Sequence, residues 1–456
     1  MGSLRVAVVG AGPAGIYAAD ILTTKYEGAS VDIIERLPAP YGLVRYGVAP
    51  DHPRIKEIIK ALLRVLGKPG IRFIGNVNYG TDITLAELQQ FYDAVIFATG
   101  AMDDRPLDIP GIDLPGSHGA ADFVSWFDGH PDVSREWTLD AEQVAVIGAG
   151  NVALDISRML SKTADEQLVT EIPQNVYEGL KANRATDVHV FARRGPAQLK
   201  FSLLELRELT HSPNVDVIVH PEGFDIDAGS EQAIQESRQT KKIVDTLLKW
   251  LDNPPSTKPH RIHLHFCESP IEVLGDDRVT GLRTERMELD GNGGVRGTGE
   301  ITDWPVQAVY RAVGYLSTPL PDVPFDEQEG VIPNEAGRVL GEDGTPLSGL
   351  YTTGWVKRGP VGLIGHTKSD AAETIQCLLD DLASLPKVAS RDVGAVIAHL
   401  EEKGIELTSG QGWTRLDDHE RALGEAVGRP RIKVVEREQM VEVSRAADDD
   451  DEALAS

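Results

Sequence analysis

A glycine-rich loop between a buried strand and a helix occurs twice in this chain, and it restricts the fold more than any other feature. The first copy, Gly-Ala-Gly-Pro-Ala-Gly at residues 10–15, follows a β-branched run at 6–9 and opens an alanine-rich helix to about residue 22. In such loops the first glycine permits a tight turn, the second lets the backbone approach a pyrophosphate, and the third lets the helix pack on the strand. The pattern predicts a dinucleotide-binding βαβ unit whose loop contacts the cofactor through Gly10, Gly12, Pro13, Ala14 and Gly15.

An acidic residue indicates which dinucleotide this first unit takes. A second strand at residues 31–35 ends in Glu35, which lies 20 residues after Gly15. A carboxylate at this position accepts hydrogen bonds from ribose hydroxyls and repels a 2′-phosphate. The first unit is therefore expected to bind FAD or NAD rather than NADP.

The second glycine loop begins 138 residues after the first and has the opposite selectivity. It follows a strand at 144–147 and opens a helix to about residue 160, and the next convincing strand, at 188–192, ends in Arg193 and Arg194. Paired guanidinium groups bind phosphate bidentately, so this unit is expected to select NADP(H), unless the two arginines only form a solvated strand end. The intervening residues 163–186 are interpreted as a helical insertion. The loop residues expected to contact the cofactor are Gly148, Ala149, Gly150, Asn151 and Val152.

Two similar strands flank the second unit and predict how the domains are joined. Residues 94–100 form a strand that ends at Thr99 and Gly100, and residues 310–315 resemble it. Either one alone could be an ordinary buried strand ending at a glycine. Together they predict an α/β fold with two Rossmann-like dinucleotide-binding domains, the NADP domain being inserted into a discontinuous FAD domain. The expected limits are 1–103 and 317–445 for the FAD domain, 104–316 for the NADP domain, and 446–456 for a disordered acidic tail.

The chain returns to the first domain through a glycine-rich segment. Gly354, Gly359, Gly362 and Gly365 lie in one loop, and a helix is expected from about residue 368 to 382. Such a loop lets backbone N–H groups approach a flavin ring, and the positive helix end favours negative charge on reduced flavin. A plain surface turn is the alternative.

The cysteine content limits the redox chemistry of the chain. The two cysteines, Cys267 and Cys377, lie 110 residues apart. This excludes a Cys-x-x-Cys pair, a four-cysteine iron–sulfur cluster and a zinc ribbon, and no metal site is expected. Any redox activity must therefore use a bound organic cofactor.

Charge and hydropathy restrict the partners. The formal net charge of −26 repels phosphate backbones, so no nucleic-acid partner is expected. The apolar run at residues 4–10 is too short for an export signal or a membrane span. We expect a cytoplasmic protein without a membrane partner.

Several further motifs resemble one family over nearly the whole chain, from Val6 to about Val435. The sequence is similar to the adrenodoxin reductase family of NADPH–ferredoxin reductases, in its bacterial form. The motifs that carry the resemblance are YGLVR at 41–45, GVAPDHP at 47–53, GAGNVALD at 148–155, RRGP at 193–196, LELREL at 204–209 and GWVKRGP at 354–360.

The resemblance implies two sets of cofactor-binding residues and two residues near the flavin. Hydride transfer needs only a nicotinamide C4 held ~3–3.5 Å from the flavin N5. The implied catalytic residues, His52 and Glu208, are therefore expected to modulate geometry or proton balance, although His52 beside Asp51 could equally be structural. FAD is expected to contact Ala14, Glu35, Leu43, Tyr79, Gly100, Trp355, Gly362, Leu363 and Ile364, and NADPH is expected to contact Arg105, residues 149–152, Arg193, Arg194, Glu205 and Gly362.

The implied activity is hydride transfer from NADPH to FAD, followed by single-electron transfers to a ferredoxin or flavodoxin. A partner face is expected on one helix, where Arg238, Lys241, Lys242 and Lys249 lie along one side. Screening over ~8–10 Å makes this local basic face more relevant than the net charge. A solvated amphipathic helix is the alternative.

Other functions compete with this reading. A different NADPH-dependent flavin oxidoreductase, such as a diaphorase, an oxidase or a monooxygenase, is the main alternative. Disulfide reductases and the small subunit of glutamate synthase need cysteine pairs or clusters that the chain does not have. A nucleotide-sensing scaffold would leave the flavin loop unexplained.

Overall fold

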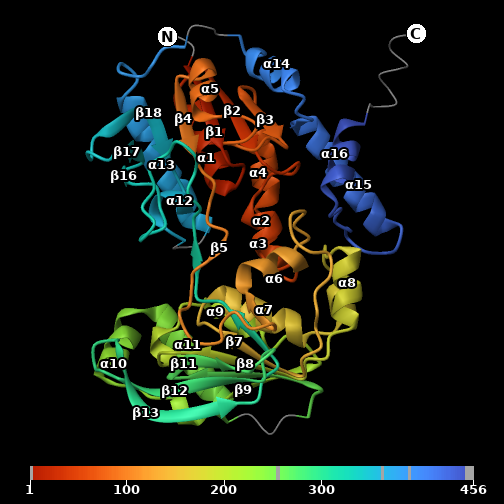
Figure 1. The fold of residues 1–456 in the computed structure, drawn as a ribbon, viewed down its shortest axis with the longest axis vertical. Coiled ribbons are helices and arrows are strands. Elements are labelled where there is room, and N and C mark those ends of the chain that lie inside the picture. The colour runs from red at the N-terminus through yellow and green to blue at the C-terminus, as the bar shows by residue number, and fades with distance from the viewer. Residues whose placement is uncertain (1–3, 253–256, 361–363, 389–391, 447–456) are drawn as a thin grey trace.

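The computed structural model describes residues 4–252, 257–360, 364–388 and 392–446. They form two α/β bodies, the first in the upper half of Figure 1 and the second in the lower half. None of the described helices is long and apolar enough to cross a membrane.

The first body is built on an eight-stranded sheet in the order β16-β17-β18-β4-β1-β2-β3-β19. Its centre is parallel, and it is buried on both faces because Val6 and Val8 pack into one apolar cluster while Ala7 and Val9 pack into another. The parallel strands are β1 (Leu4–Val9), β2 (Ala29–Glu35), β3 (Ile71–Gly75), β4 (Ala94–Phe97) and β18 (Pro346–Thr352), and the antiparallel edges are β16 (Asn334–Glu335), β17 (Arg338–Leu340) and β19 (Thr408–Ser409).

Helices cover this sheet and lead into its ligand-binding edge. Helix α1 (Pro13–Lys25) packs against α4 (Ile59–Leu66) and α13 (Ile364–Asp380). Helix α13 begins four residues before the expected start at 368, because Gly365 is helical and does not end the loop. The remaining helices of this body are α2 (Leu43–Tyr46), α3 (Pro53–Lys56), α5 (Leu85–Phe91), α12 (Trp355–Arg358), α14 (Ala395–Glu402), α15 (Gly410–Glu425) and α16 (Arg437–Arg445).

The second body contains a six-stranded parallel sheet in the order β6-β14-β7-β8-β10-β9. The strands are β6 (Ser117–Gly119), β7 (Gln143–Ile147), β8 (Asp187–Ala192), β9 (Val215–Val219), β10 (His260–Phe266) and β14 (Ala308–Arg311). The apolar cluster on one face is closed by α6 (Ala120–Phe127), α7 (Asn151–Ser161), α9 (Leu203–Glu208) and α11 (Arg238–Leu251).

Smaller elements complete the second body. The other face of its sheet packs in part against an antiparallel sheet of β11 (Glu268–Leu274), β12 (Gly281–Leu289) and β13 (Val295–Trp304), which the sequence pattern did not predict. The expected helical insertion at 163–186 contains η1 (Ala164–Gln167) and α8 (Gln174–Lys181). Two short 3₁₀ helices and one α-helix remain, namely η2 (Pro196–Gln198), η3 (Pro221–Gly223) and α10 (Ala228–Glu236).

The chain crosses between the bodies twice, at one place. Strand β5 (Asp103–Asp104) runs toward the second body and pairs antiparallel with β15 (Tyr315–Leu316), which runs back (Figure 1). Strand β18 then lies beside β4, although the two are about 250 residues apart in sequence. The predicted fold class, with one Rossmann-like unit inserted into another, is confirmed. The residue limits given above stay predictions, and the acidic tail beyond Ala446 lies outside the described residues.

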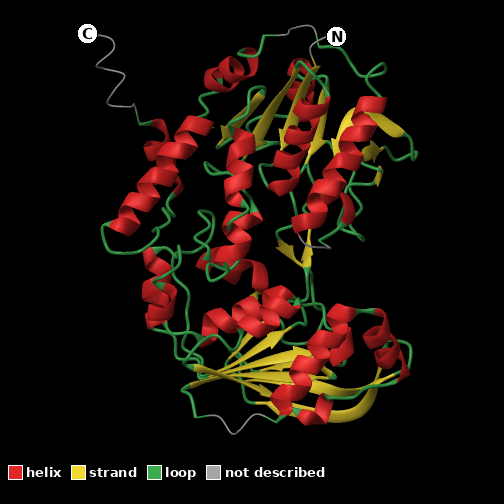
Figure 2. Ribbon diagram, turned by 180° about the vertical axis from the view of Figure 1, so that it is seen from behind, coloured by secondary structure: helices red, strands yellow, loops and turns green. Residues whose placement is uncertain are grey.

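The C-terminal helices bind the two bodies together. Figure 2 shows α15 and α16 along the side of the first body, reaching down toward α8 of the second. The segment between them carries Lys433, whose buried ammonium group lies 3.4 Å from Asp128 and 3.0 Å from Glu171. Arg437 contacts Asp132 at 2.6 Å. These ion pairs bring the inserted unit into a defined position against the first.

Candidate functional site

A cavity of about 520 Å³ lies at the carboxyl ends of the strands in the first body. This edge of a doubly wound sheet is where such folds bind nucleotides. The first glycine loop and the return segment meet in its wall. The residues predicted to bind FAD that line this cavity are Gly10, Gly12, Pro13, Ala14, Glu35, Leu43, Tyr79, Gly100 and Trp355.

The first glycine loop has the backbone that its residue types require. Gly10 has a φ of +109°, and a Cβ there would lie 2.5 Å from the carbonyl oxygen of Ala98. A Cβ on Gly15 would lie 2.1 Å from the carbonyl oxygen of Gly10, so the helix could not pack as it does. A Cβ on Gly12 meets no described atom within 4 Å. Gly12 therefore exposes its backbone to the cavity at the N-terminus of α1, where a phosphate group would be bound.

Glu35 is held in place by the loop that it faces. One carboxylate oxygen accepts a hydrogen bond from the Ala11 N–H at 2.8 Å, and the other accepts one from the Leu37 N–H at 3.2 Å. Burial raises the pKa of Glu35, and these two hydrogen bonds oppose the rise. The carboxylate is thus oriented toward the cavity, where it can accept hydrogen bonds from a ribose.

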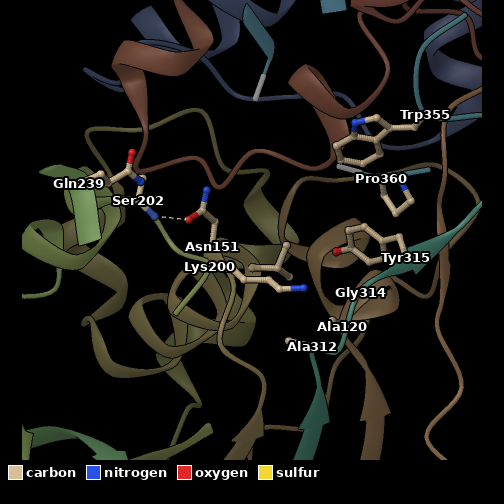
Figure 3. A pocket seen from close by; sticks show the side chains of 11 residues that line it. Ala120, Asn151, Lys200, Ser202, Gln239, Ala312, Gly314, Tyr315, Trp355 and Pro360 are labelled. Atoms are coloured by element: carbon tan, nitrogen blue, oxygen red, sulfur yellow. Dashed lines mark hydrogen bonds between the residues drawn. The ribbon is translucent and has the colours of Figure 1, made fainter. Parts of the chain in front are cut away.

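A second cavity of about 310 Å³ lies over the second glycine loop. Gly150 faces open space, as Gly12 does, whereas a Cβ on Gly148 would lie 2.3 Å from the carbonyl oxygen of Ala312. Figure 3 shows Asn151 and Lys200 on one side of this cavity and Trp355 with Tyr315 on the other. Its remaining lining residues are Ala120, Val152, Ser202, Gln239, Ala312, Gly314 and Pro360.

The two cavities share part of their walls. Val152, Tyr315 and Trp355 line both of them. Trp355 begins α12, directly after Gly354, whose φ of +78° turns the chain toward the second body. Two ligands bound at the two glycine loops would therefore meet beside these three residues.

The arginines predicted to hold NADPH lie outside the lining of both cavities. Arg193 and Arg194 follow β8 with exposed side chains, and neither forms an ion pair with a described residue. Arg105 is also exposed, and its backbone N–H donates to the carbonyl of Gly314 at 2.9 Å. The three guanidinium groups are available to an anionic ligand that extends beyond the second cavity.

His52 lies in a buried cluster of charged residues between the two bodies. It precedes α3, and the Nδ1 atom of its ring lies 2.5 Å from a carboxylate oxygen of Glu208. Its Nε2 lies 2.5 Å from Glu205 and 2.8 Å from Asp155. Burial by itself would lower the pKa of His52, but the hydrogen bond to Asp155 and the close carboxylates of Glu205 and Glu208 outweigh it and raise the pKa to about 11. The imidazole is therefore protonated at neutral pH and joins α3 to α7 and α9.

An arginine completes this cluster. Arg158, also on α7, contacts Asp51 through Nε at 2.6 Å and Asp155 at 2.7 Å. Burial would raise the pKa of Asp51, but Arg158 holds it below its usual range. Glu205, which was predicted to bind NADPH, has a buried side chain facing His52 and Arg158 and lines neither cavity.

Some residues of these sites were not predicted from the sequence, and some predicted residues lie outside the part of the chain that the structure describes. Asp155 and Arg158 are one helical turn apart after the glycine loop, a spacing that could have indicated a shared face. Lys200 stands in an irregular loop, where no periodic pattern marks it. Gly362 and Leu363 lie outside the described residues, and Ile364 begins α13 without a described side chain.

The predicted basic residues lie on one exposed side of α11. Arg238, Lys241, Lys242 and Lys249 are all exposed, while the opposite side of the helix buries Ile243, Val244 and Leu247 in the core. Lys241 forms a surface ion pair with Asp245 at 3.3 Å. The same helix carries Gln239 into the wall of the second cavity.

Comparison with known proteins gives one consistent result. The family model described as pyridine nucleotide-disulphide oxidoreductase matches residues 4–195. NADPH-ferredoxin reductase FprA of Mycobacterium tuberculosis is 39% identical over 96% of this chain and 98% of its own length. The human mitochondrial NADPH:adrenodoxin oxidoreductase is 38% identical over 96% of this chain and 91% of its own. The solved structure of Mycobacterium tuberculosis FprA in complex with NADPH aligns with a TM-score of 0.89 at 37% identity, covering 98% of this chain and all of that one.

Proposed function

The chain belongs to the adrenodoxin reductase family of NADPH–ferredoxin reductases, and from that premise we propose that its first cavity binds FAD and its second binds NADPH. It is a flavin-dependent oxidoreductase that passes electrons from NADPH to a ferredoxin. When bound, FAD supplies the chemistry that joins these partners, since a flavin accepts a hydride and releases electrons one at a time.

The residues of the first cavity fit FAD. Gly12 offers backbone N–H groups at the start of a 13-residue helix, which suits the pyrophosphate. Glu35 can accept hydrogen bonds from a ribose, and Trp355 and Tyr79 provide aromatic surface in the lining of the same cavity. The lining of the cavity is largely apolar, which suits a flavin ring system.

The residues of the second body fit NADPH. Gly150 exposes its backbone at the start of α7, where the pyrophosphate of this second dinucleotide would lie. The exposed guanidinium groups of Arg193 and Arg194 then bind the 2′-phosphate, which NADH does not have. We infer from this arrangement that the first body selects against a 2′-phosphate and the second selects for it.

The observation that carries the proposal is the wall shared by the two cavities. Since Val152, Tyr315 and Trp355 line both, a nicotinamide and a flavin held at the two glycine loops can be brought into contact there. Hydride transfer depends on this contact and requires no protein acid or base. The task of the chain is therefore to hold the two rings together.

We assign His52 and Glu208 a positioning role in this reaction. The protonated His52 ring is fixed between carboxylates of α7 and α9, both of which border the NADPH cavity or its loop. The ring thus sets the position of one body against the other. A change here should alter the rate of hydride transfer more than the affinity for FAD.

Purified protein tests the proposed cofactors. It should be yellow, with a flavin absorbance band that bleaches with NADPH far faster than with NADH under anaerobic conditions. Ferredoxin added to the reaction should then accelerate reduction of cytochrome c. Colourless protein that cannot be reconstituted with FAD contradicts the proposal, and NADPH oxidation that no ferredoxin accelerates favours a diaphorase or an oxidase.

The exposed side of α11 is proposed as the ferredoxin-docking face. Its four cations, Arg238, Lys241, Lys242 and Lys249, complement the negative surface typical of ferredoxins, and Gln239 places the same helix beside the NADPH cavity. The variant Lys241→Glu, Lys242→Glu should slow ferredoxin-dependent cytochrome c reduction at low salt, with no loss of ferricyanide reduction. The matched control is Lys60→Glu, Arg64→Glu on α4, which makes the same charge change on the first body. Equal effects of the two variants would refute this docking face.

The cytoplasmic location stays a prediction. Fractionation of the producing cells, with the flavin band followed in the soluble and membrane fractions, would test it.

A further inference from the structure

Lys200 occupies a place that connects the second glycine loop to the second cavity. It lies between η2 and α9, six residues after Arg194. Its backbone N–H donates to the carbonyl oxygen of Ala149 at 2.9 Å, so the lysine is tied directly to the glycine loop. Its side chain is exposed, and Figure 3 shows the amino group pointing into the cavity, toward Tyr315.

The charge of Lys200 has no counterpart in this cavity. Of the eleven lining residues, Lys200 is the one that carries a charge at neutral pH. It forms no ion pair within the part of the chain that the structure describes. The N-terminus of α7 at Asn151, which lines the same cavity, is also positive. Two positive features that face one cavity attract an anionic ligand to it.

We propose that Lys200 binds the pyrophosphate of NADPH, an inference that rests on the function proposed above. The choice of phosphate follows from where the parts of the dinucleotide lie. The 2′-phosphate is assigned to Arg193 and Arg194 at the end of β8, whereas the pyrophosphate lies at the glycine loop to which Lys200 is bonded. From that loop a bound nicotinamide half would extend into the cavity that Tyr315 and Trp355 line.

Lys200 and the two arginines then have different effects, because Lys200 affects the affinity for the cofactor and the arginines affect the preference for NADPH over NADH. The pyrophosphate is common to NADPH and NADH, so Lys200 stabilises both cofactors equally. The two arginines contact a group that only NADPH has. Loss of Lys200 should therefore weaken binding of both cofactors without changing the preference for NADPH.

The test compares Lys200→Met and Lys200→Arg with the control Lys60→Met, which removes a lysine that is 77% exposed on α4. Steady-state rates are measured with ferricyanide as acceptor, so that ferredoxin docking plays no part. Lys200→Met should raise the KM for NADPH and for NADH by the same factor, about tenfold, with kcat nearly unchanged. Lys200→Arg should recover most of the loss, and the control should match the wild type.

A fragment of the cofactor identifies which phosphate is contacted. The inhibitor 2′-AMP carries the 2′-phosphate but no pyrophosphate, so its inhibition constant should be the same in Lys200→Met and in the wild type. Unchanged KM values in Lys200→Met would overturn the proposal, and so would a loss of 2′-AMP inhibition as large as the loss of NADPH binding. The flavin spectrum and the Tm of each variant show that it is folded and holds FAD. Wild-type protein without flavin or without NADPH oxidation would instead refute the underlying function before any variant is compared.

Discussion

Acidification below pH 6.5 should destabilise the second body, because four neutral histidines lie stacked on one face of its parallel sheet. We call this group the histidine stack; it consists of His189 on β8, His263 and His265 on β10, and His220 after β9. Their ring centroids lie 4.4 Å apart for His189 and His263 and 4.2 Å apart for His220 and His265.

The hydrogen bonds of the stack pair its four rings in their neutral forms. His265 Nε2 lies 3.0 Å from His189 Nδ1, and His220 Nε2 lies 3.1 Å from His263 Nδ1, so each pair shares one proton. The outer nitrogens of His189 and His263 face acceptors, the Gln143 side-chain oxygen at 3.0 Å and Asp187 at 2.9 Å. A further proton on His189 or His263 would place two N–H donors against each other, whereas on His265 or His220 it would go to Nδ1, for which no hydrogen bond to a described residue is seen.

Burial outweighs the acidic neighbours of the stack, Asp187 and Glu222, which by themselves would raise the pKa of His189, His263 and His220. Asp187 is the acidic group that faces the stack most closely, and it is neutralised by Arg261 at the same sheet edge. Burial lowers the pKa of His189 to about 3 and that of His265 to about 2. It also lowers the pKa of His220 and of His263.

The size of the effect follows from linkage. A histidine whose folded pKa lies below its unfolded value of about 6.5 contributes stability that is present above pH 6.5 and is lost as the pH falls. When the pH falls from 7.5 to 5.5, each such histidine lowers the free energy of unfolding by about 1.4 kcal/mol, because the unfolded chain gains a proton that the folded chain does not. His189 and His265 together should therefore lower the free energy of unfolding by about 3 kcal/mol over this range.

Denaturant unfolding followed by far-UV circular dichroism at pH 7.5 and 5.5 measures this loss. The variant His265→Phe keeps a ring that can stack on Phe191, which lies 4.9 Å from His265 between centroids, but it cannot take up a proton. Its stability should depend less on pH than that of the wild type, by about 1.4 kcal/mol over the same interval. An equal loss of stability in the variant and the wild type would refute this reasoning.

Three further changes test the cofactor sites and the charged cluster. Arg193→Ala with Arg194→Ala should raise the KM for NADPH by about 10- to 100-fold and leave that for NADH within twofold, measured as initial rates; equal losses would exclude a 2′-phosphate site there. Gly12→Ala should give a folded but colourless protein, because the added methyl group meets no described atom and faces the proposed pyrophosphate position; normal flavin absorbance at about 450 nm would contradict this. His52→Gln should lower the free energy of unfolding by about 3–5 kcal/mol, because buried carboxylates lose the imidazolium that faces them. FAD should stay bound in this variant. A Tm equal to that of the wild type would show that the cluster adds no stability.

The local patterns were sufficient for much of the fold and part of the site. A strand, a glycine loop, a helix and a terminal acid or arginine pair are contiguous in sequence, and each has a backbone requirement that residue type reveals. Gly10 and Gly148 have positive φ values and no room for a Cβ, whereas Gly12 and Gly150 face open space, as their order in the motif indicates. Two Rossmann-like units with opposite charge at the ends of their second strands could therefore be predicted from the sequence.

Contacts between distant residues could not be predicted in this way. His52 meets Asp155 across 103 residues of sequence, and the pKa of its ring depends on three carboxylates that no local pattern associates with it. The histidine stack joins two strands and a loop whose histidines look unrelated when the sequence is read alone. The antiparallel sheet of β11 to β13 was also not predicted.

By itself, then, the sequence predicted which dinucleotide each unit accepts, because backbone geometry and the charge at a strand end act within one contiguous segment. Only the tertiary structure decided that the two cavities share Val152, Tyr315 and Trp355, and that Lys200 points into the second one. Those positions depend on how the inserted unit packs against the first, through ion pairs such as that of Lys433 with Asp128. The energy of such packing is distributed over residues hundreds of positions apart, so no single segment encodes it.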